Sequence, residues 1–184
     1  SDIEAGQRYI IVNVELRGAT PPDLRGLERH FYTNSACGVC GRASVDALRV
    51  RPTVPIEAGR PLLPAAVLRS LPERLRAGQR LFDSTGGLHA AALFTPDGEL
   101  EVLREDVGRH NALDKVVGWG LLNQRLPFAD RVLMVSGRTS YAILQKAVAA
   151  GVPVISAISA PSSLAVDIAT EFGVTLVGFL RVSR

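Results

Sequence analysis

Two cysteines separated by two residues, Cys37 and Cys40, are the only cysteines in this chain of 184 residues. Thiols at this spacing can supply half of a zinc site, form a redox-active dithiol, or carry a sulfur atom as a persulfide. Gly38 and Gly41 lie beside them, within a polar stretch over 33–44. Glycines at these positions favour a flexible segment with accessible thiols, which a mobile sulfur carrier requires.

The residues alone leave four interpretations of the cysteine pair open. A zinc site needs two more ligands, and the three histidines, His30, His89 and His110, have no paired spacing. A thioredoxin-like dithiol opens a helix directly after a strand, whereas the stretch 33–44 is polar and rich in small residues. A buried, inert pair conflicts with those polar neighbours. A sulfur carrier agrees with them, but the spacing does not single it out.

Further candidate groups lie in four polar, glycine-rich clusters that we place just after predicted strands. The clusters span 85–87, 106–111, 136–140 and 159–162. Ligands of open α/β sheets bind at the carboxyl ends of strands. Three of the clusters also precede a predicted helix, whose free N–H groups and positive dipole end favour an anion. The clusters therefore predict an anion or nucleotide site.

Within these clusters, two arginines and a glycine are suited to binding a phosphate or another anion. Arg138 follows Gly137 and is a natural phosphate clamp, because its planar guanidinium matches the geometry of a phosphate. Arg109 and its two successors would form an anion site at a helix N-terminus, with Asp106 as the expected helix cap. Gly86 would let a ligand approach the backbone closely.

The elements that must position these clusters follow from hydrophobic periodicity. The expected strands span 8–16, 90–95, 99–104, 131–135, 152–158 and 174–180, and the expected helices span 64–75, 109–122, 141–150 and 161–172. Pro72 weakens the end of the first helix. A turn at 96–98 joins two strands into a hairpin, and the later alternation of strands and helices predicts parallel strands. The sequence therefore predicts an α/β fold with a mixed sheet.

Composition excludes several classes of protein. The chain is 47% hydrophobic with a net charge of +3, so intrinsic disorder is excluded. Two cysteines are too few for a small secreted protein held together by disulfide bonds. Apolar stretches such as 116–122 and 152–166 are too short or too broken to span a membrane. With no signal peptide visible at the start, we expect a cytoplasmic protein. The 21 basic and 18 acidic residues allow an anionic ligand without requiring nucleic acid.

Six stretches taken together resemble the formate dehydrogenase accessory sulfurtransferase family, FdhD. They span 35–41, 82–94, 104–115, 135–140, 159–161 and 176–181. The string over 104–115, Arg-Glu-Asp-Val-Gly-Arg-His-Asn-Ala-Leu-Asp-Lys, is the most specific of them. Two departures stand out. Ala142 occupies a position where the family usually has an acid, and family members usually carry a longer segment before the cysteine pair.

The resemblance implies a sulfur carrier. Such a protein takes sulfur from a cysteine desulfurase and delivers it to the molybdenum or tungsten bis(molybdopterin guanine dinucleotide) cofactor of apo formate dehydrogenase. Cys37 would carry the persulfide and Cys40 would assist it. The resemblance also implies a homodimer that binds guanosine diphosphate as a mimic of part of the cofactor. The alternative is a non-enzymatic chaperone that binds the cofactor for apo formate dehydrogenase.

The family fold is similar to that of cytidine deaminase, with helices on both faces of a mixed sheet. Zinc deaminases place His-x-Glu and Pro-Cys-x-x-Cys where this chain has 109–112 and 136–140, so we expect no zinc. We expect a remnant of a smaller N-terminal portion at 1–32, a mobile cysteine loop and linker at 33–63, and the cofactor-binding domain at 64–184. The residues expected to bind the cofactor are Thr85, Gly86, Gly87, His89, Asp106, Gly108, Arg109, His110, Asn111, Asp114, Lys115, Ser136, Gly137, Arg138, Ser140, Ser159, Ala160, Gly178, Phe179, Leu180, Arg181 and Arg184.

Overall fold

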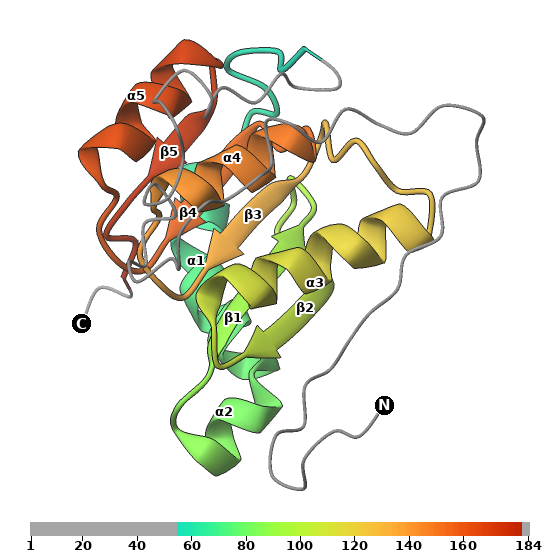
Figure 1. Ribbon diagram of the computed structural model, residues 1–184, viewed down its shortest axis with the longest axis vertical. Coiled ribbons are helices and arrows are strands. Elements are labelled where there is room, and N and C mark those ends of the chain that lie inside the picture. Colours follow the sequence, from blue (N-terminus) through green and yellow to red (C-terminus); the bar gives the residue numbers. More distant parts are fainter. Residues whose placement is uncertain (1–54, 182–184) are drawn as a thin grey trace, which may run out of the picture.

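Five helices and five strands make up the part of the chain described by the computed structural model, residues 55–181 (Figure 1). In chain order they are α1 (Ala65–Gly78), α2 (Arg80–Thr85), β1 (His89–Phe94), β2 (Leu100–Asp106), α3 (Arg109–Leu122), β3 (Val132–Val135), α4 (Tyr141–Ala149), β4 (Val154–Ala157), α5 (Ser163–Glu171) and β5 (Thr175–Val177). The cysteine pair and the first expected strand lie outside the described residues. The expected division of the chain at residues 32 and 63 stays a prediction.

The five strands form one mixed sheet in the order β2-β1-β3-β4-β5. Strand β1 runs antiparallel to both of its neighbours, whereas β3, β4 and β5 are parallel to one another. The predicted hairpin and the predicted parallel strands are therefore confirmed. The central strand β3 is buried along its whole length, which explains its continuous apolar sequence, Val-Leu-Met-Val.

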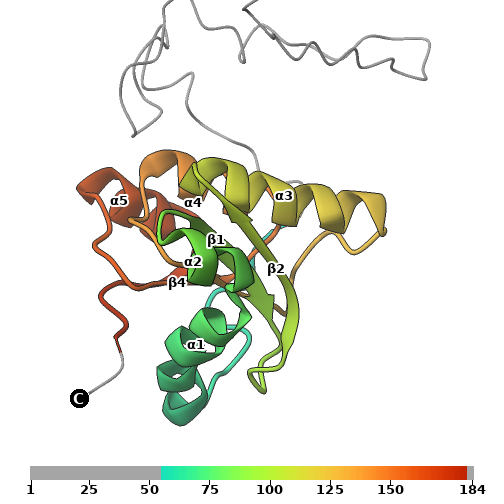
Figure 2. The same ribbon diagram turned by 90° about the horizontal axis from the view of Figure 1, so that it is seen from below.

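Helices cover both faces of the sheet, as predicted (Figure 2). On one face, α3, α4 and α5 pack over strand residues that include Leu93, Leu133 and Ile155. On the other face, Leu71 and Leu75 of α1 pack over the alternate strand positions. Each central strand thus sends successive side chains into two separate apolar clusters, as the two-residue period of a strand requires. The likeness to cytidine deaminase stays a prediction.

The first two helices differ from the sequence-based prediction: one expectation is wrong, and one helix was missed. Helix α1 does not weaken at Pro72 but continues through it to Gly78. Burial of Pro72 together with Leu71 and Leu75 stabilises this turn and outweighs the hydrogen bond that proline cannot donate. The short helix α2 was not expected. It buries none of its six residues, and the Glu105 carboxylate accepts hydrogen bonds from its first N–H groups, at 2.9 and 2.8 Å.

Among residues 55–181, no helix combines the length and the apolar character that crossing a membrane would take.

Candidate anion-binding site

The polar clusters converge on one edge of the sheet because β1 runs against its neighbours. His89, at the start of β1, lies opposite Asp106, at the end of β2. Val135, at the end of β3, pairs with Ala91 on one side and Ala157 on the other. One correction follows. The cluster at 85–87 precedes a strand rather than following one, and it reaches this edge only because β1 is antiparallel.

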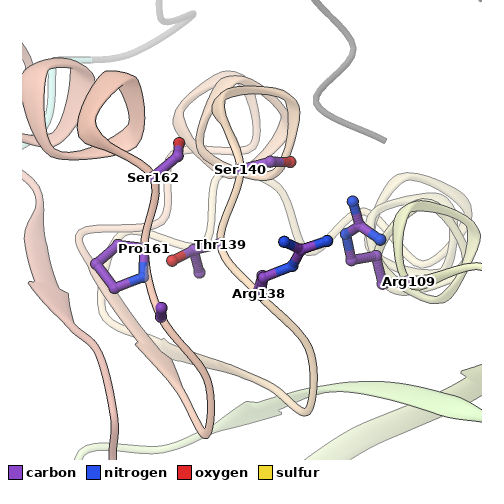
Figure 3. Close-up of a pocket in the computed structure, with 7 residues that line it drawn as sticks. Arg109, Arg138, Thr139, Ser140, Pro161 and Ser162 are labelled. Atoms are coloured by element: carbon purple, nitrogen blue, oxygen red, sulfur yellow. The ribbon is translucent and has the colours of Figure 1, made fainter. Parts of the chain in front are cut away.

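A cavity of about 260 Å³ opens at this edge. It is lined by Arg109, Arg138, Thr139, Ser140, Ala160, Pro161 and Ser162, and we call it the first cavity. Four of these seven residues are among those expected to bind the cofactor. Figure 3 shows that the guanidinium groups of Arg138 and Arg109 face the same space from two different elements. Two like charges in one cavity are stabilised when an anion lies between them.

Three helices begin at the rim of the first cavity. Arg109 is the first residue of α3, Ser140 precedes α4, and Ser162 precedes α5. The first N–H groups of a helix have no partner within the helix, and its dipole places partial positive charge there. The Ser162 hydroxyl accepts a hydrogen bond from the N–H of Ala165 at 3.2 Å, while Ser140 caps no N–H group with its side chain. The prediction that a helix starts at three of the polar clusters is confirmed.

Thr139 supplies an uncommitted polar atom at the base of this cavity. Its side chain is fully buried, and its hydroxyl oxygen has no hydrogen-bond partner. Its backbone is held firmly, since its N–H donates to Ala160 O at 3.3 Å and its carbonyl accepts from Ser162 N at 2.9 Å. A buried hydroxyl without a partner costs stability unless a ligand satisfies it. The arrangement suits an oxyanion, whose oxygens would accept from Thr139 and both arginines.

We expect Thr139→Val to stabilise the empty protein by about 1 kcal/mol, because valine has nearly the same shape and removes an unsatisfied buried hydroxyl. The same change should weaken phosphate binding, since one donor is lost. Urea denaturation with and without phosphate would measure both effects. A Thr139→Val protein that is less stable without ligand would contradict this account of the hydroxyl.

The turn before α3 holds a network around Asp106. One carboxylate oxygen of Asp106 accepts from Gly108 N at 2.9 Å and from Asn111 Nδ2 at 3.1 Å, and the other lies 2.6 Å from Lys115 Nζ. Chiefly the hydrogen bond from Lys115, and then that from Gly108, lower the pKa of Asp106 to about 2. Asp106 is therefore not the helix cap that we expected. Gly108 occupies the N-cap position of α3. The Asp106 carboxylate instead accepts from the N–H of Gly108, in the turn before the helix.

His110 does not line the first cavity but contacts one of its lining residues. Its Nε2 lies 3.1 Å from the hydroxyl of Ser140, which does line the cavity. Asp114, also expected to bind the cofactor, forms an ion pair with Lys146 that ties α3 to α4. These residues, like the Asp106 network, support α3, which carries Arg109, and the start of α4, which follows Arg138.

A second cavity of about 440 Å³ opens at the same edge. It is lined by Arg76, Gln79, Phe82, Gly86, Gly87, Leu88, His89, Ser136 and Ile158. His89 Nδ1 lies 3.4 Å from the hydroxyl of Ser136, which also accepts from Ala90 N at 2.9 Å. Burial first, and the charge of Arg109 second, lower the pKa of His89 below its usual value of about 6.5. Uncharged imidazole therefore predominates at neutral pH.

The last described segment returns to this edge without lining either cavity. The N–H groups of Phe179 and Leu180 donate to the carbonyls of Ser159 and Ala157, at 3.2 and 2.9 Å. Phe179 has a positive φ of 55° and is 61% exposed. A side chain at Gly178 would lie 2.6 Å from Pro161 Cδ, so glycine is required for this close approach.

Some expected site residues lie elsewhere, and some lining residues were not expected. Thr85 lines no described cavity, and its hydroxyl donates to Leu81 O at 2.9 Å within α2. Arg181 is exposed, and Arg184, Cys37 and Cys40 fall outside the described residues. Lining residues missed from the sequence are Thr139, Pro161 and Ser162 in the first cavity, and Arg76, Gln79, Phe82, Leu88 and Ile158 in the second. Thr139, Pro161 and Ser162 lie inside the polar clusters, which was a usable signal. The five missed residues of the second cavity lie outside those clusters, and no pattern in the sequence marked them.

Over residues 55–181, side chains of histidine, cysteine, aspartate and glutamate do not gather in a group of three or more that would hold a metal ion. The expected absence of zinc from the whole chain stays a prediction.

The mixed sheet, its two helical layers and the strand-end cavities define an α/β domain whose first cavity is suited to an oxyanion. The chain belongs to the FdhD/NarQ family, whose model matches residues 1–184. This confirms the family predicted from the six stretches.

Individual relatives agree with this assignment. The sulfur carrier protein FdhD of Streptomyces coelicolor is 56% identical over 183 residues, which are 98% of this chain and 64% of that protein. Its counterpart in Mycobacterium tuberculosis is 51% identical over 176 residues, 94% of this chain and 63% of that protein. A crystal structure of a formate dehydrogenase accessory protein from Desulfotalea psychrophila is similar, with a TM-score of 0.63 and 32% identity. That match covers 73% of this chain and 56% of the other. The chain thus spans slightly less than two thirds of the length of the curated relatives that it matches.

Proposed function

We propose that this chain is a sulfur carrier for the maturation of formate dehydrogenase. It would carry sulfur as a persulfide on Cys37 and bind the guanylyl part of the bis(molybdopterin guanine dinucleotide) cofactor at the strand-end cavities. Membership of the FdhD/NarQ family and relatives named sulfur carrier proteins support the carrier role. One observation on this chain carries the binding role: two arginines, three helix N-termini and an uncommitted buried hydroxyl surround one cavity.

The proposed chemistry is two transfers of one sulfur atom. The Cys37 thiolate attacks the outer sulfur of a persulfide on a cysteine desulfurase, a new S–S bond forms, and the desulfurase leaves as its thiolate. The Cys40 thiolate would then attack the inner sulfur of that persulfide, so that a Cys37–Cys40 disulfide forms and the outer sulfur leaves at the sulfide level. The metal of the cofactor, which is the substrate here, would take up this sulfide. Cys40, three positions after Cys37, would thus assist the release of sulfur, and a thiol reductant would return both cysteines to thiols.

The first cavity would hold a phosphate of the cofactor by charge and by hydrogen bonds. Arg109 and Arg138 supply charge-assisted donors, which bind phosphate more strongly than neutral donors do. The N–H groups at the starts of α4 and α5 add donors that require no side-chain movement. A nucleoside diphosphate would reach from this cavity toward the second, on the other side of Gly137.

Intact-protein mass measurement tests the carrier role directly. The chain is incubated with a cysteine desulfurase and cysteine, beside its Cys37→Ala and Cys40→Ala variants. The unmodified sequence should gain the mass of one or more sulfur atoms, and Cys37→Ala should gain none. A reducing agent should reverse the gain, since a persulfide is reducible.

A different outcome would favour the alternative. If the unmodified chain gains no sulfur yet binds guanosine diphosphate, a cofactor-binding chaperone without a persulfide explains the cavity better. The desulfurase and formate dehydrogenase as partners, the homodimer and the cytoplasmic location are part of the same proposal. Size-exclusion chromatography with light scattering would test the homodimer.

A further inference from the structure

Two basic side chains, one from each cavity, approach each other at Gly137. A Cβ atom at Gly137 would lie 3.2 Å from Arg109 Cδ and 3.2 Å from His89 Nδ1. Arg109 lines the first cavity, and His89 lines the second. Because residue 137 is a glycine, no Cβ atom stands at the point that both side chains approach.

The other charged groups near His89 keep a fixed charge. Asp106 pairs with His89 across β1 and β2, but its carboxylate is bound to Lys115 and stays ionised because its pKa is about 2. Arg76, from α1, also lines the second cavity, and its guanidinium forms an ion pair with Asp83 at 2.6 Å. Among the described residues that line the second cavity, His89 is therefore the one side chain that changes charge between about pH 5 and pH 8.

We propose that an oxyanion bound between Arg109 and Arg138 is coupled to a proton on His89 across Gly137. The inference rests on the proposed function, because it takes the first cavity to be the anion site. In the empty protein the charge of Arg109 opposes a second positive charge on His89. A bound anion compensates the arginines, so His89 then accepts a proton more readily. Filling the first cavity thus favours a further positive charge in the second cavity, beside that of Arg76.

Thermodynamic linkage fixes the sign of the effect. If an anion favours protonated His89, protonation must favour the anion equally. Anion affinity should therefore rise as the pH falls, mostly below about pH 6.5, where His89 takes up its proton. For two charges this close, partly screened by water, we expect roughly threefold tighter binding at about pH 5.5 than at about pH 7.5. A ligand with a second anionic group would fill both cavities best at the lower pH.

Nuclear magnetic resonance of the imidazole Cε1–H signals, followed by pH titration, tests the coupling. Sulfate is the probe, because its own charge does not change over this range, and sodium chloride keeps the ionic strength equal. The signal that disappears in His89→Gln belongs to His89. Its titration midpoint should lie below about 6.5 without sulfate and rise by about half a pH unit with saturating sulfate. In Arg138→Gln, the same sulfate concentration should raise the midpoint much less.

The backbone amide signals of Thr139 and Ser162 separate failure of the coupling from failure of the site. If sulfate moves those signals while the His89 midpoint stays in place, the coupling is overturned and the anion cavity stands. If sulfate moves neither, the first cavity is not an anion site, and both ideas are overturned. An equal rise of the midpoint in Arg138→Gln would also overturn the coupling, since it would reflect a general effect of sulfate.

Discussion

Replacing Arg109 and Arg138 together by glutamine should weaken the binding of guanosine diphosphate by about a hundredfold or more. Each guanidinium offers charge-assisted hydrogen bonds to one cavity, and such bonds contribute about 1.5–3 kcal/mol each. Two losses of this size correspond to at least two powers of ten in the dissociation constant, and calorimetric titration would measure it. Each single glutamine variant should lose about tenfold.

Two control variants separate geometry from charge in this experiment. Arg138→Lys keeps the positive charge but loses the planar fork, so its affinity should lie between those of Arg138→Gln and the unmodified chain. Arg125→Gln removes an exposed cation beyond the end of α3, close to Glu101, and should change affinity little. If the double variant binds guanosine diphosphate as tightly as the unmodified chain, the first cavity does not hold its phosphates.

Gly120→Ala should be among the most damaging single-methyl changes in α3. Gly120 is buried, and a Cβ atom there would clash with the ring of Phe128, with Cε1 only 2.7 Å away. Phe128 is itself almost fully buried, so its ring cannot move aside without opening the core. Overpacking of this kind costs about 1–3 kcal/mol, even after the helix preference of alanine is included. Chemical denaturation would measure the loss as a lower midpoint.

Gly118→Ala, two residues away in the same helix, is the matched control. A Cβ atom at Gly118 meets nothing within 4 Å, so alanine there should stabilise α3 by about 0.5–1 kcal/mol through its better helix propensity. Opposite signs for the two substitutions would identify contact with Phe128, rather than helix propensity, as the cause. A Gly120→Ala protein as stable as the Gly118→Ala protein would contradict the packing of Phe128 against α3.

The sheet and its later helices were predictable because their signals are local and strong. Strand β3 is a short, continuous apolar run, and α5 has a capping Ser162 before it and a stop at Gly173 after it. Such signals depend on residues within one or two turns of each other. Helix α1 was foreseen for the same reason, but its true end was not. Pro72 lowers the local preference for helix, but the packing of Leu71 and Leu75 on the sheet stabilises the helix beyond it.

The site was only partly predictable, because its parts come together through sheet topology. Arg109 and Arg138 were expected from their places before helices, and both line the first cavity. The burial of the Thr139 hydroxyl depends on the neighbouring loop around Pro161, which no local pattern reveals. The supporting role of His110 likewise depends on its contact with Ser140, thirty residues further along the chain.

Three helices that start at one edge of the sheet also have a kinetic consequence. Because β2, β3 and β4 all run toward that edge, α3, α4 and α5 begin there with their dipoles pointing the same way. Their positive ends and the two arginines add up to a field that extends beyond the cavity mouth. An approaching polyanion would be guided toward the cavity before any contact forms, so its association rate, more than its dissociation rate, would fall as salt is added.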